Sequence, residues 1–145
     1  MTSLVFVVAV GAAAACLMAA PVHTGNQAYR VTGRLMCGRQ PARGVTVKLV
    51  DEDDGPNPDD TLQEAETDGG GRFTVEGYTN EVTPIDLRLK IYHNCNDGYT
   101  PCDRKWKFEL PDKYITEGTR ASQTLDIGTW NLEVELREEE RDCFR

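Results

Sequence analysis

The sequence predicts an antiparallel β-sandwich of seven to eight short strands in a single domain. Apolar and polar residues alternate along most of the chain after the first 20 residues, which is the period of a half-buried strand. Turn signals rich in Gly and Pro recur about every eight to twelve residues, as in sandwich domains. No segment of roughly ten residues carries a helical apolar stripe. A chain of 145 residues is also of the size that forms one core.

Each expected strand is bounded by a turn signal. Gly38–Gly44 and Asp68–Gly71 are expected turns because of their Gly and Pro content. The loop Asp51–Asp60 contains two prolines, which cannot donate to a strand ladder. Pro111–Gly118 is expected to form at most one helical turn. Alternation predicts strands within residues 29–36, 45–49, 61–67, 73–75, 85–93, 105–110 and 125–136.

The first 20 residues predict export. They carry no charge, 17 of them are apolar, and the run ends in small residues, as a secretory signal peptide does. We therefore expect a signal peptide at residues 1–20 and a secreted domain at 21–145. A membrane anchor and a buried core helix are the alternatives, but the run is short for a span and lacks a basic flank after it. The protein is not expected to be an integral membrane protein.

Four cysteines remain after the signal peptide, and an even number in an exported chain indicates two disulfides. Three pairings are possible. The preferred one joins Cys95 to Cys102, closing a short loop, and Cys37 to Cys143, tying the tail to the domain. Zinc is the alternative, but the chain has no Cys-x-x-Cys pair and only two histidines.

The charge balance is acidic, with a net charge of −8, which argues against nucleic acid as a partner. Carboxylates concentrate in the loop 51–60, and calcium binds such oxygens in flexible loops. An EF-hand needs Gly at its sixth position, where Pro56 stands, so a solvated loop is the favoured interpretation. The calcium candidates are Asp51, Asp53, Asp54, Asp59 and Asp60.

Motifs of catalysis are missing from the sequence. It contains no Gly-x-Ser-x-Gly, no phosphate-binding Gly-rich loop with Lys and no His-Glu-x-x-His. His93 lies on the apolar face of its strand, which favours a structural role. We expect no enzymatic activity and no cofactor. Sandwich loops are the expected contact sites, and the candidates outside the acidic loop are Tyr99 in the loop 94–103 and a cationic patch of Arg104, Lys105 and Lys107.

Several segments together resemble the nematode transthyretin-like family. Residues 31–49 read VTGRLMCGRQPARGVTVKL and are similar to the opening of that family; residues 67–73, 91–95, 102–104 and 111–115 match it in order. The resemblance implies a prealbumin-like, immunoglobulin-like sandwich in the extracellular space and no particular ligand.

Two activities of related proteins are not expected. Hydrolases of 5-hydroxyisourate end in Tyr-Arg-Gly-Ser, whereas this chain ends in Asp-Cys-Phe-Arg. Transthyretin carries thyroid hormone in the channel of a tetramer, and the outward Asn131, Glu133 and Glu135 of the expected last strand disfavour that assembly.

The sequence therefore favours a secreted, non-enzymatic protein that binds an unknown extracellular protein or cell-surface ligand and bridges a cell-surface component to a protein partner. The alternative is a carrier of a small apolar ligand such as a lipid or a hormone-like molecule. A calcium-dependent adhesion module is a third hypothesis. The oligomeric state stays open.

Overall fold

The computed structural model describes residue 11 and residues 25–52, 59–81 and 85–144. The expected signal peptide, apart from Gly11, and the calcium candidates Asp53 and Asp54 lie outside the described residues. The same holds for His23, one of the two histidines of the sequence. Within the described part of the chain, no helix is long and apolar enough to cross a membrane.

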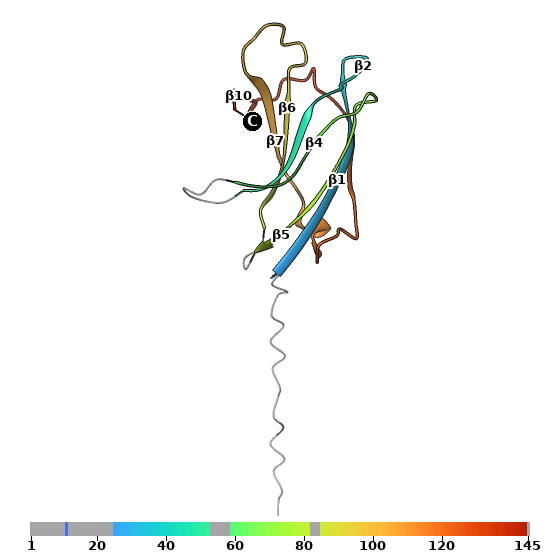
Figure 1. The fold of residues 1–145 in the computed structure, drawn as a ribbon, viewed down its shortest axis with the longest axis vertical. Helices are drawn as coiled ribbons and strands as arrows, with labels where there is room; N and C mark the ends of the chain where they lie inside the picture. The colour runs from blue at the N-terminus through green and yellow to red at the C-terminus, as the bar shows by residue number, and fades with distance from the viewer. Residues whose placement is uncertain (1–10, 12–24, 53–58, 82–84, 145) are drawn as a thin grey trace, which may run out of the picture.

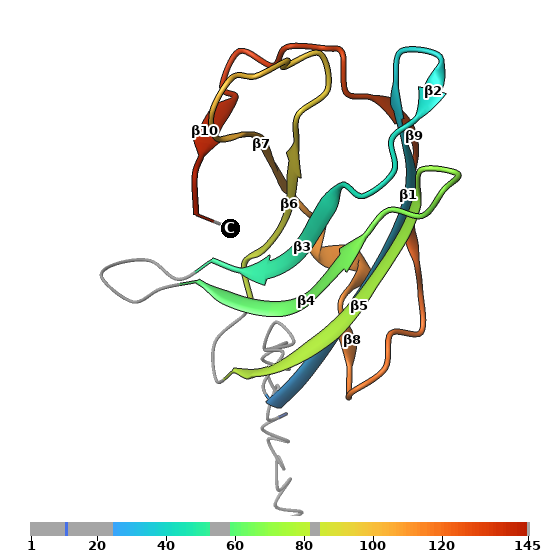
Figure 2. The same ribbon diagram turned by 45° about the horizontal axis from the view of Figure 1, so that its top comes forward.

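The described residues form two five-stranded sheets that pack face to face (Figures 1 and 2). The first sheet is built around β1 (Gly25–Cys37), which pairs with the other four strands of that sheet. All pairs are antiparallel except β1 with β9, which is parallel. The partners of β1 are β2 (Gln40–Pro41), β5 (Arg72–Glu81), β8 (Thr116–Glu117) and β9 (Leu125–Asn131).

The second sheet is antiparallel throughout, in the order β10-β7-β6-β3-β4. These strands are β3 (Thr46–Asp51), β4 (Asp60–Glu66), β6 (Leu87–His93), β7 (Asp103–Glu109) and β10 (Glu140–Asp142). The β-sandwich is thus confirmed. The described residues form ten strands instead of the expected seven to eight, and three of the ten, β2, β8 and β10, are only two or three residues long. The single helical turn expected after Pro111 is the 3-10 turn η1 (Asp112–Tyr114).

The core lies between the two sheets and follows the alternation of the sequence. Every second residue of β1 is buried from Tyr29 to Leu35, and the same holds for Leu87–Ile91 of β6. Since strand side chains alternate between the two faces of a sheet, each strand gives one face to the core.

A tight hairpin turn joins β4 to β5 at residues 68–71. The Asp68 carboxylate accepts hydrogen bonds from the backbone N–H groups of Gly70 and Arg72, each at 2.9 Å. Gly71 has φ +75°, and a Cβ there would lie 2.2 Å from the Leu35 carbonyl oxygen. Only glycine fits this position, because other residues rarely adopt positive φ and would also clash.

The expected strand over residues 125–136 ends at Asn131, and the remainder of that prediction is wrong. The Asn131 side-chain oxygen accepts the backbone N–H groups of Gly38 and Glu133, each at 3.1 Å, and this bond to Glu133 turns the chain. Leu132 nevertheless stays fully buried. Residues 132–139 therefore leave the sheet and cross the end of the sandwich.

Two disulfides involve all four expected cysteines, but the preferred pairing is wrong. Cys37 bonds to Cys95, and Cys102 bonds to Cys143. Cys95 follows β6 and is buried in the core, where it meets the end of β1, so this bridge joins the two sheets. Cys102 precedes β7 and meets the tail because β10 pairs with β7. With separations of 58 and 41 residues, each bridge contributes roughly 4 kcal/mol by loop entropy, as an upper figure.

Candidate functional site

The sandwich is closed along one side and open along the other. On the closed side β4 lies against β5, so that a Cβ on Gly77 would be 2.8 Å from that of Leu62. On the open side lie β7 of one sheet and β9 of the other, and β10 pairs only with residues 103–105 of β7. The rest of β7 pairs with no other described strand on that side, and residues 136–139 border residues 106–108 across a hollow of about 310 Å³.

An apolar groove of about 320 Å³ lies along this open side. The rings of Phe108 and Trp130 meet across it with centroids 4.6 Å apart, and Trp106 packs edge-on against Phe108 at 5.9 Å. Val134 forms part of the wall and is 54% exposed. The other lining residues are Thr129, Asn131 and Leu136. The groove is a candidate binding site because apolar concavities with few polar groups are typical of ligand and peptide sites.

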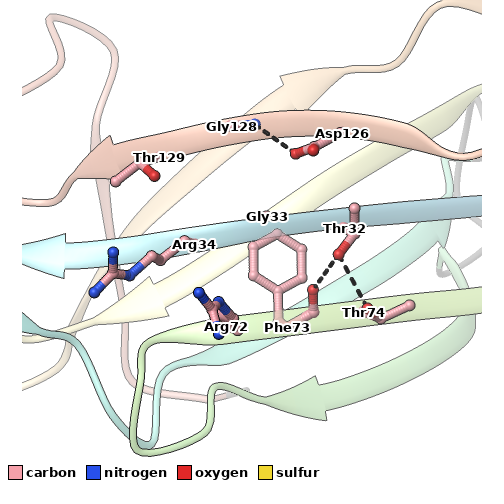
Figure 3. Close-up of a pocket in the computed structure, with 9 residues that line it drawn as sticks. All are labelled: Thr32, Gly33, Arg34, Arg72, Phe73, Thr74, Asp126, Gly128 and Thr129. Atoms are coloured by element: carbon pink, nitrogen blue, oxygen red, sulfur yellow. Dashed lines mark hydrogen bonds between the residues drawn. The ribbon is translucent and has the colours of Figure 1, made fainter.

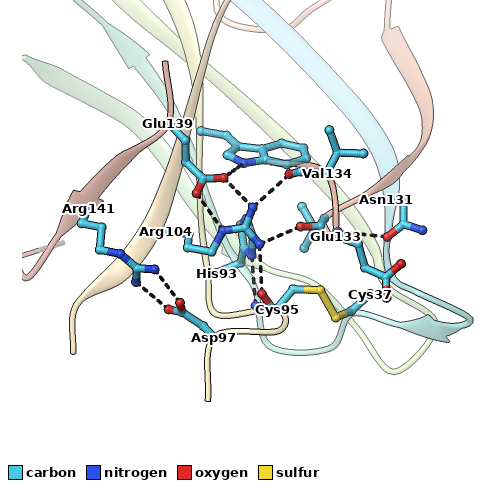
Figure 4. A network of polar contacts seen from close by, with 12 residues as sticks. Cys37, His93, Cys95, Asp97, Arg104, Asn131, Glu133, Val134, Glu139 and Arg141 are labelled. Atoms are coloured by element: carbon cyan, nitrogen blue, oxygen red, sulfur yellow. Dashed lines mark hydrogen bonds and ion pairs between the residues drawn. A yellow bond between two sulfur atoms is a disulfide. The ribbon is translucent and has the colours of Figure 1, made fainter. Parts of the chain in front are cut away.

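A buried ion pair holds the wall of the groove in place (Figure 4). The guanidinium of Arg104, whose side chain is 5% exposed, donates to both carboxylate oxygens of Glu139, at 2.8 and 2.6 Å. It also donates to the carbonyl oxygens of Cys95, Leu132 and Val134, each at 2.9 Å. These bonds fix the segment 132–139 over the end of β7.

Glu139 links the same network to the groove floor. One of its oxygens accepts the indole N–H of Trp106 at 2.6 Å. Its hydrogen bonds from Arg104 lower the pKa of the Glu139 carboxyl, so it stays charged. The indole ring is therefore oriented by a charged group rather than by packing alone.

The relatives of this chain are consistent with the resemblance in its sequence. A family model described as the Transthyretin-like family matches residues 32–111. The chain belongs to the transthyretin-like family. Transthyretin-like protein 46 of Caenorhabditis elegans is 49% identical over 120 residues, which cover 82% of this chain and 67% of the relative. Transthyretin-like protein 5 of the same organism is 44% identical over 131 residues, covering 89% and 94%.

A third relative is similar to the same extent. Transthyretin-like protein 33 of Caenorhabditis elegans is 43% identical over 119 residues, covering 82% of this chain and 83% of its own. Among solved structures, a 9R-lipoxygenase from Cyanothece PCC8801 aligns with 72% of this chain but only 16% of its own, at 24% identity and a TM-score of 0.38. That weak likeness adds nothing to the family assignment.

The cationic patch expected in this family member is not a free positive surface. Arg104 is buried, so its prediction as a contact residue is wrong. Lys105 lies 3.4 Å from the Asp142 carboxylate and over the ring of Tyr92. Lys107 bonds Glu52 at 2.9 Å, and this bond raises the pKa of the lysine. Arg104 shares strand parity with Trp106, a pattern that predicts an inward side chain.

Tyr99 and the acidic loop are the remaining predicted contact residues. Tyr99 is fully exposed and stays a prediction as a contact. Asp59 bonds Lys90 at 2.8 Å, whereas Asp51 is buried and accepts the backbone N–H of Asp86. Carboxylate oxygens of Asp51, Asp60 and Glu81 lie within 4.8 Å of one another. Glu81 was not among the calcium candidates because it comes from a different strand, and calcium binding itself stays a prediction.

His93 occupies a structural position at the end of β6. It is 4% exposed, its Nδ1 accepts the backbone N–H of Cys95 at 3.1 Å, and its ring packs edge-on against Trp106. Burial, helped by the charge of Arg104, lowers its pKa from 6.5 to about 4. The imidazole is therefore neutral at neutral pH.

Proposed function

We propose that this family member is an extracellular, non-enzymatic binding protein whose groove takes an extended apolar segment of a partner protein. The observation that carries the proposal is that the aromatic groove lies directly beside a strand edge that pairs with no other described strand. An extended peptide can add to such an edge by backbone hydrogen bonds while alternate side chains enter the adjacent apolar groove.

The backbone of β7 offers those hydrogen bonds. The N–H of Leu110 donates to the carbonyl of Leu87 in β6 at 3.0 Å, and antiparallel ladders use alternate residues. The peptide groups of Phe108 thus face β6, whereas those of Lys107 and Glu109 face outward, beyond the reach of β10. An added strand would pair at these two residues, next to the rings of Phe108 and Trp130.

The charge around the groove favours a basic partner segment. Residues 133–138 form one wall and its rim, and they contain three glutamates and one arginine. A second copy of this chain would bring two such rims together in a protein of net charge −8, and like charges across an interface oppose association. We therefore infer a partner segment in which Lys or Arg flank apolar residues.

Two further observations support an extracellular and non-enzymatic role. Two disulfides persist only in an oxidising compartment in most organisms, in agreement with the expected signal peptide. His93, the imidazole within the described residues, is buried and bonded to backbone, where it cannot reach a substrate as a general base.

The chain carries its own reporter for this proposal. Its two tryptophans, Trp106 and Trp130, both line the groove. Ten-residue peptides with alternating apolar residues would be titrated while Trp emission is followed, once with Lys flanks and once with Glu flanks. We expect the Lys-flanked peptide to shift the emission and to bind more tightly. Some residues of the bound peptide would donate their backbone N–H groups to β7. Replacing these residues by proline should abolish binding, because proline has no backbone N–H to donate.

Matched variants locate the site. Val134→Arg places a charged side chain in the groove wall, and Tyr78→Arg makes the same kind of change on β5, where the side chain is 52% exposed, similar to Val134. Val134→Arg should lose peptide binding and Tyr78→Arg should keep it. Equal behaviour of the two variants, or of the two peptides, contradicts the proposal.

The carrier of a small apolar ligand is the competing interpretation of the same groove. Native mass spectrometry of the purified protein distinguishes them: a lipid or hormone-like molecule that stays bound, and that blocks the peptide, would replace the proposed function. A stable homodimer through the groove would do the same.

A further inference from the structure

A second hollow, of about 360 Å³, lies on the outer face of the sheet built around β1, across β1, β5 and β9 (Figure 3). Polar and apolar groups line it about equally, whereas the groove is apolar, and the two share only Thr129 of β9. Its rim is made by two arginines and three threonines. The lining residues are Thr32, Gly33, Arg34, Arg72, Phe73, Thr74, Asp126, Gly128 and Thr129.

A bulge in β9 shapes this hollow. Thr32 pairs with Asp126 and Arg34 with Thr129, so two residues of β9 lie opposite the single residue Gly33. A Cβ on Gly33 would be 2.5 Å from the side chain of Ile127, so glycine is required for this close approach. The bulge places Thr129 beside Arg34 at the edge of the hollow.

Two arginines stand opposite each other across the ladder. Arg34 of β1 is the register partner of Arg72 of β5, and like charges directly opposite are destabilising. Four residues earlier in β1, Arg30 is the register partner of Glu76 and forms a 2.5 Å ion pair with it. The positive charge of Arg30 is thus neutralised by the opposite strand, whereas Arg34 and Arg72 stand opposite each other.

Neither of these two arginines has an ion-pair partner among the described residues. Arg34 donates through Nε to the carbonyl of Gly70 at 3.0 Å, a neutral acceptor. Two carboxylates of neighbouring turns bond backbone groups: Asp68 accepts the N–H groups of Gly70 and Arg72, and Asp126, which lines the hollow, accepts that of Gly128 at 2.8 Å. Because no ion pair joins either carboxylate to Arg34 or Arg72, the guanidinium ends are available to a ligand.

One hydroxyl adds to the donor set. Thr32 donates its hydroxyl hydrogen to the carbonyl of Phe73 at 3.0 Å and accepts that of Thr74, also at 3.0 Å, so both are used within the sheet. Thr129, which borders Arg34 on the other side, is the hydroxyl left for a ligand. Planar guanidinium groups bind the oxygens of carboxylate, sulfate and phosphate in a bidentate manner. Two guanidinium groups and one hydroxyl offer more donors than the two oxygens of a carboxylate can use, so the set suits an oxyanion with three free oxygens.

We infer that this hollow binds a tetrahedral oxyanion ester, with Arg34 and Arg72 as its two cationic ligands, and that the ester is a sulfate group on an extracellular polysaccharide. A flexible sugar chain can reach a small positive hollow on an acidic protein. A flat anionic membrane would also face the remaining surface of a protein of net charge −8, which repels it. The inference stands independently of the groove; together the two sites would equip one domain to bridge a surface polysaccharide and a protein.

The first experiment tests the hollow itself with inorganic sulfate. Amide shifts of the intact, disulfide-bonded protein are followed by ¹⁵N NMR during titration with sodium sulfate, at constant ionic strength set with sodium chloride. Saturable shifts confined to residues around 32–34, 72–74 and 126–129 are expected. Non-saturating shifts, or the same shifts with chloride alone, overturn the inference.

Matched double variants separate the site from general charge effects. Arg34→Gln with Arg72→Gln should weaken sulfate binding about tenfold or more, since a charge-assisted bond is lost at each position. Arg39→Gln with Arg43→Gln removes the same charge from exposed positions elsewhere and should change binding less than about twofold. Thermal unfolding of both variants checks that they remain folded. Equal weakening in the two variants contradicts the assignment.

The second experiment identifies the source of the oxyanion. A sulfated oligosaccharide should bind in calorimetry, its desulfated counterpart should not, and the Arg34→Gln, Arg72→Gln variant should lose the binding. Vesicles containing an anionic phospholipid form the parallel arm. Binding to vesicles that depends on the two arginines, without binding to the sulfated oligosaccharide, would replace the polysaccharide by a lipid phosphate and refute the proposed ligand.

Discussion

Replacing Arg104 by methionine tests whether the buried ion pair holds the wall of the groove. The change keeps a long apolar side chain but removes a guanidinium that serves three carbonyl groups and the Glu139 carboxylate. Glu139, whose side chain is 15% exposed, would keep its negative charge with only the Trp106 indole as partner. Breaking a buried pair by removing one member costs about 3–5 kcal/mol, mainly through the charge left behind.

The expected loss is large enough to measure directly. About 3–5 kcal/mol corresponds to a fall in Tm of roughly 12–20 °C for a domain of this size. Differential scanning calorimetry with the disulfides intact measures it. Because the segment 132–139 loses its anchor, the emission of the two tryptophans should also shift to longer wavelength below the unfolding transition.

Lys107→Met provides the control on the same strand. Lys107 bonds Glu52 at 2.9 Å, but its side chain is 40% exposed, and exposed ion pairs contribute about 0–1 kcal/mol. If Arg104→Met lowers Tm no more than Lys107→Met does, the ion pair does not hold the wall and the reasoning fails.

Three further predictions concern other parts of the fold. The pKa of His93 is about 4 in the folded protein against 6.5 in the unfolded chain, so the unfolded chain binds the proton more readily, and the contribution of His93 to stability is complete above pH 6.5 and falls by up to about 3 kcal/mol as the pH drops towards 4. Denaturant unfolding between pH 6.5 and 5 should show this loss of stability, and His93→Asn should reduce it; an unchanged pH dependence in the variant would assign the loss to other groups. Gly71→Ala should cost at least about 2 kcal/mol through positive φ and the clash with a backbone carbonyl, while Gly69→Ala, with open space around its Cβ, should stay within about 0.5 kcal/mol; equal Tm values for the two would contradict the geometry. If the carboxylates of Asp51, Asp60 and Glu81 bind calcium, millimolar calcium should raise the Tm of the wild type but not of Asp60→Asn. A calorimetric titration with calcium that releases no heat of binding would remove the adhesion hypothesis.

The strands of the sandwich were largely predictable because their signal is local. The alternation from Tyr29 to Leu35 and from Leu87 to Ile91 marks buried faces correctly, and the Asp-Gly-rich hairpin at 68–71 lies where its residues predict it. The same alternation misled beyond Asn131, where a side-chain hydrogen bond to the next turn ends the strand. Alternation alone does not reveal such a turn, in which the Asn131 side chain bonds the backbone two residues later.

The candidate sites were less predictable because each joins residues far apart in the chain. Trp106 and Trp130 lie within expected strands, but their spacing along the chain does not show that they line one groove, because β7 and β9 belong to different sheets. Nothing in the spacing of Arg34 and Arg72 along the chain pairs them, and only the register of β1 and β5 sets them opposite each other.

The sequence by itself determined the fold class, the family resemblance and the use of four cysteines in two disulfides, since these depend on local periodicity, motif order and counting. The tertiary structure alone decided the pairing of the disulfides, the burial of Arg104 beside Glu139, and the positions of the groove and the arginine hollow. The physical reason is that these features depend on register and on strand ends that meet in space, and neither is encoded in the spacing of residues along one strand.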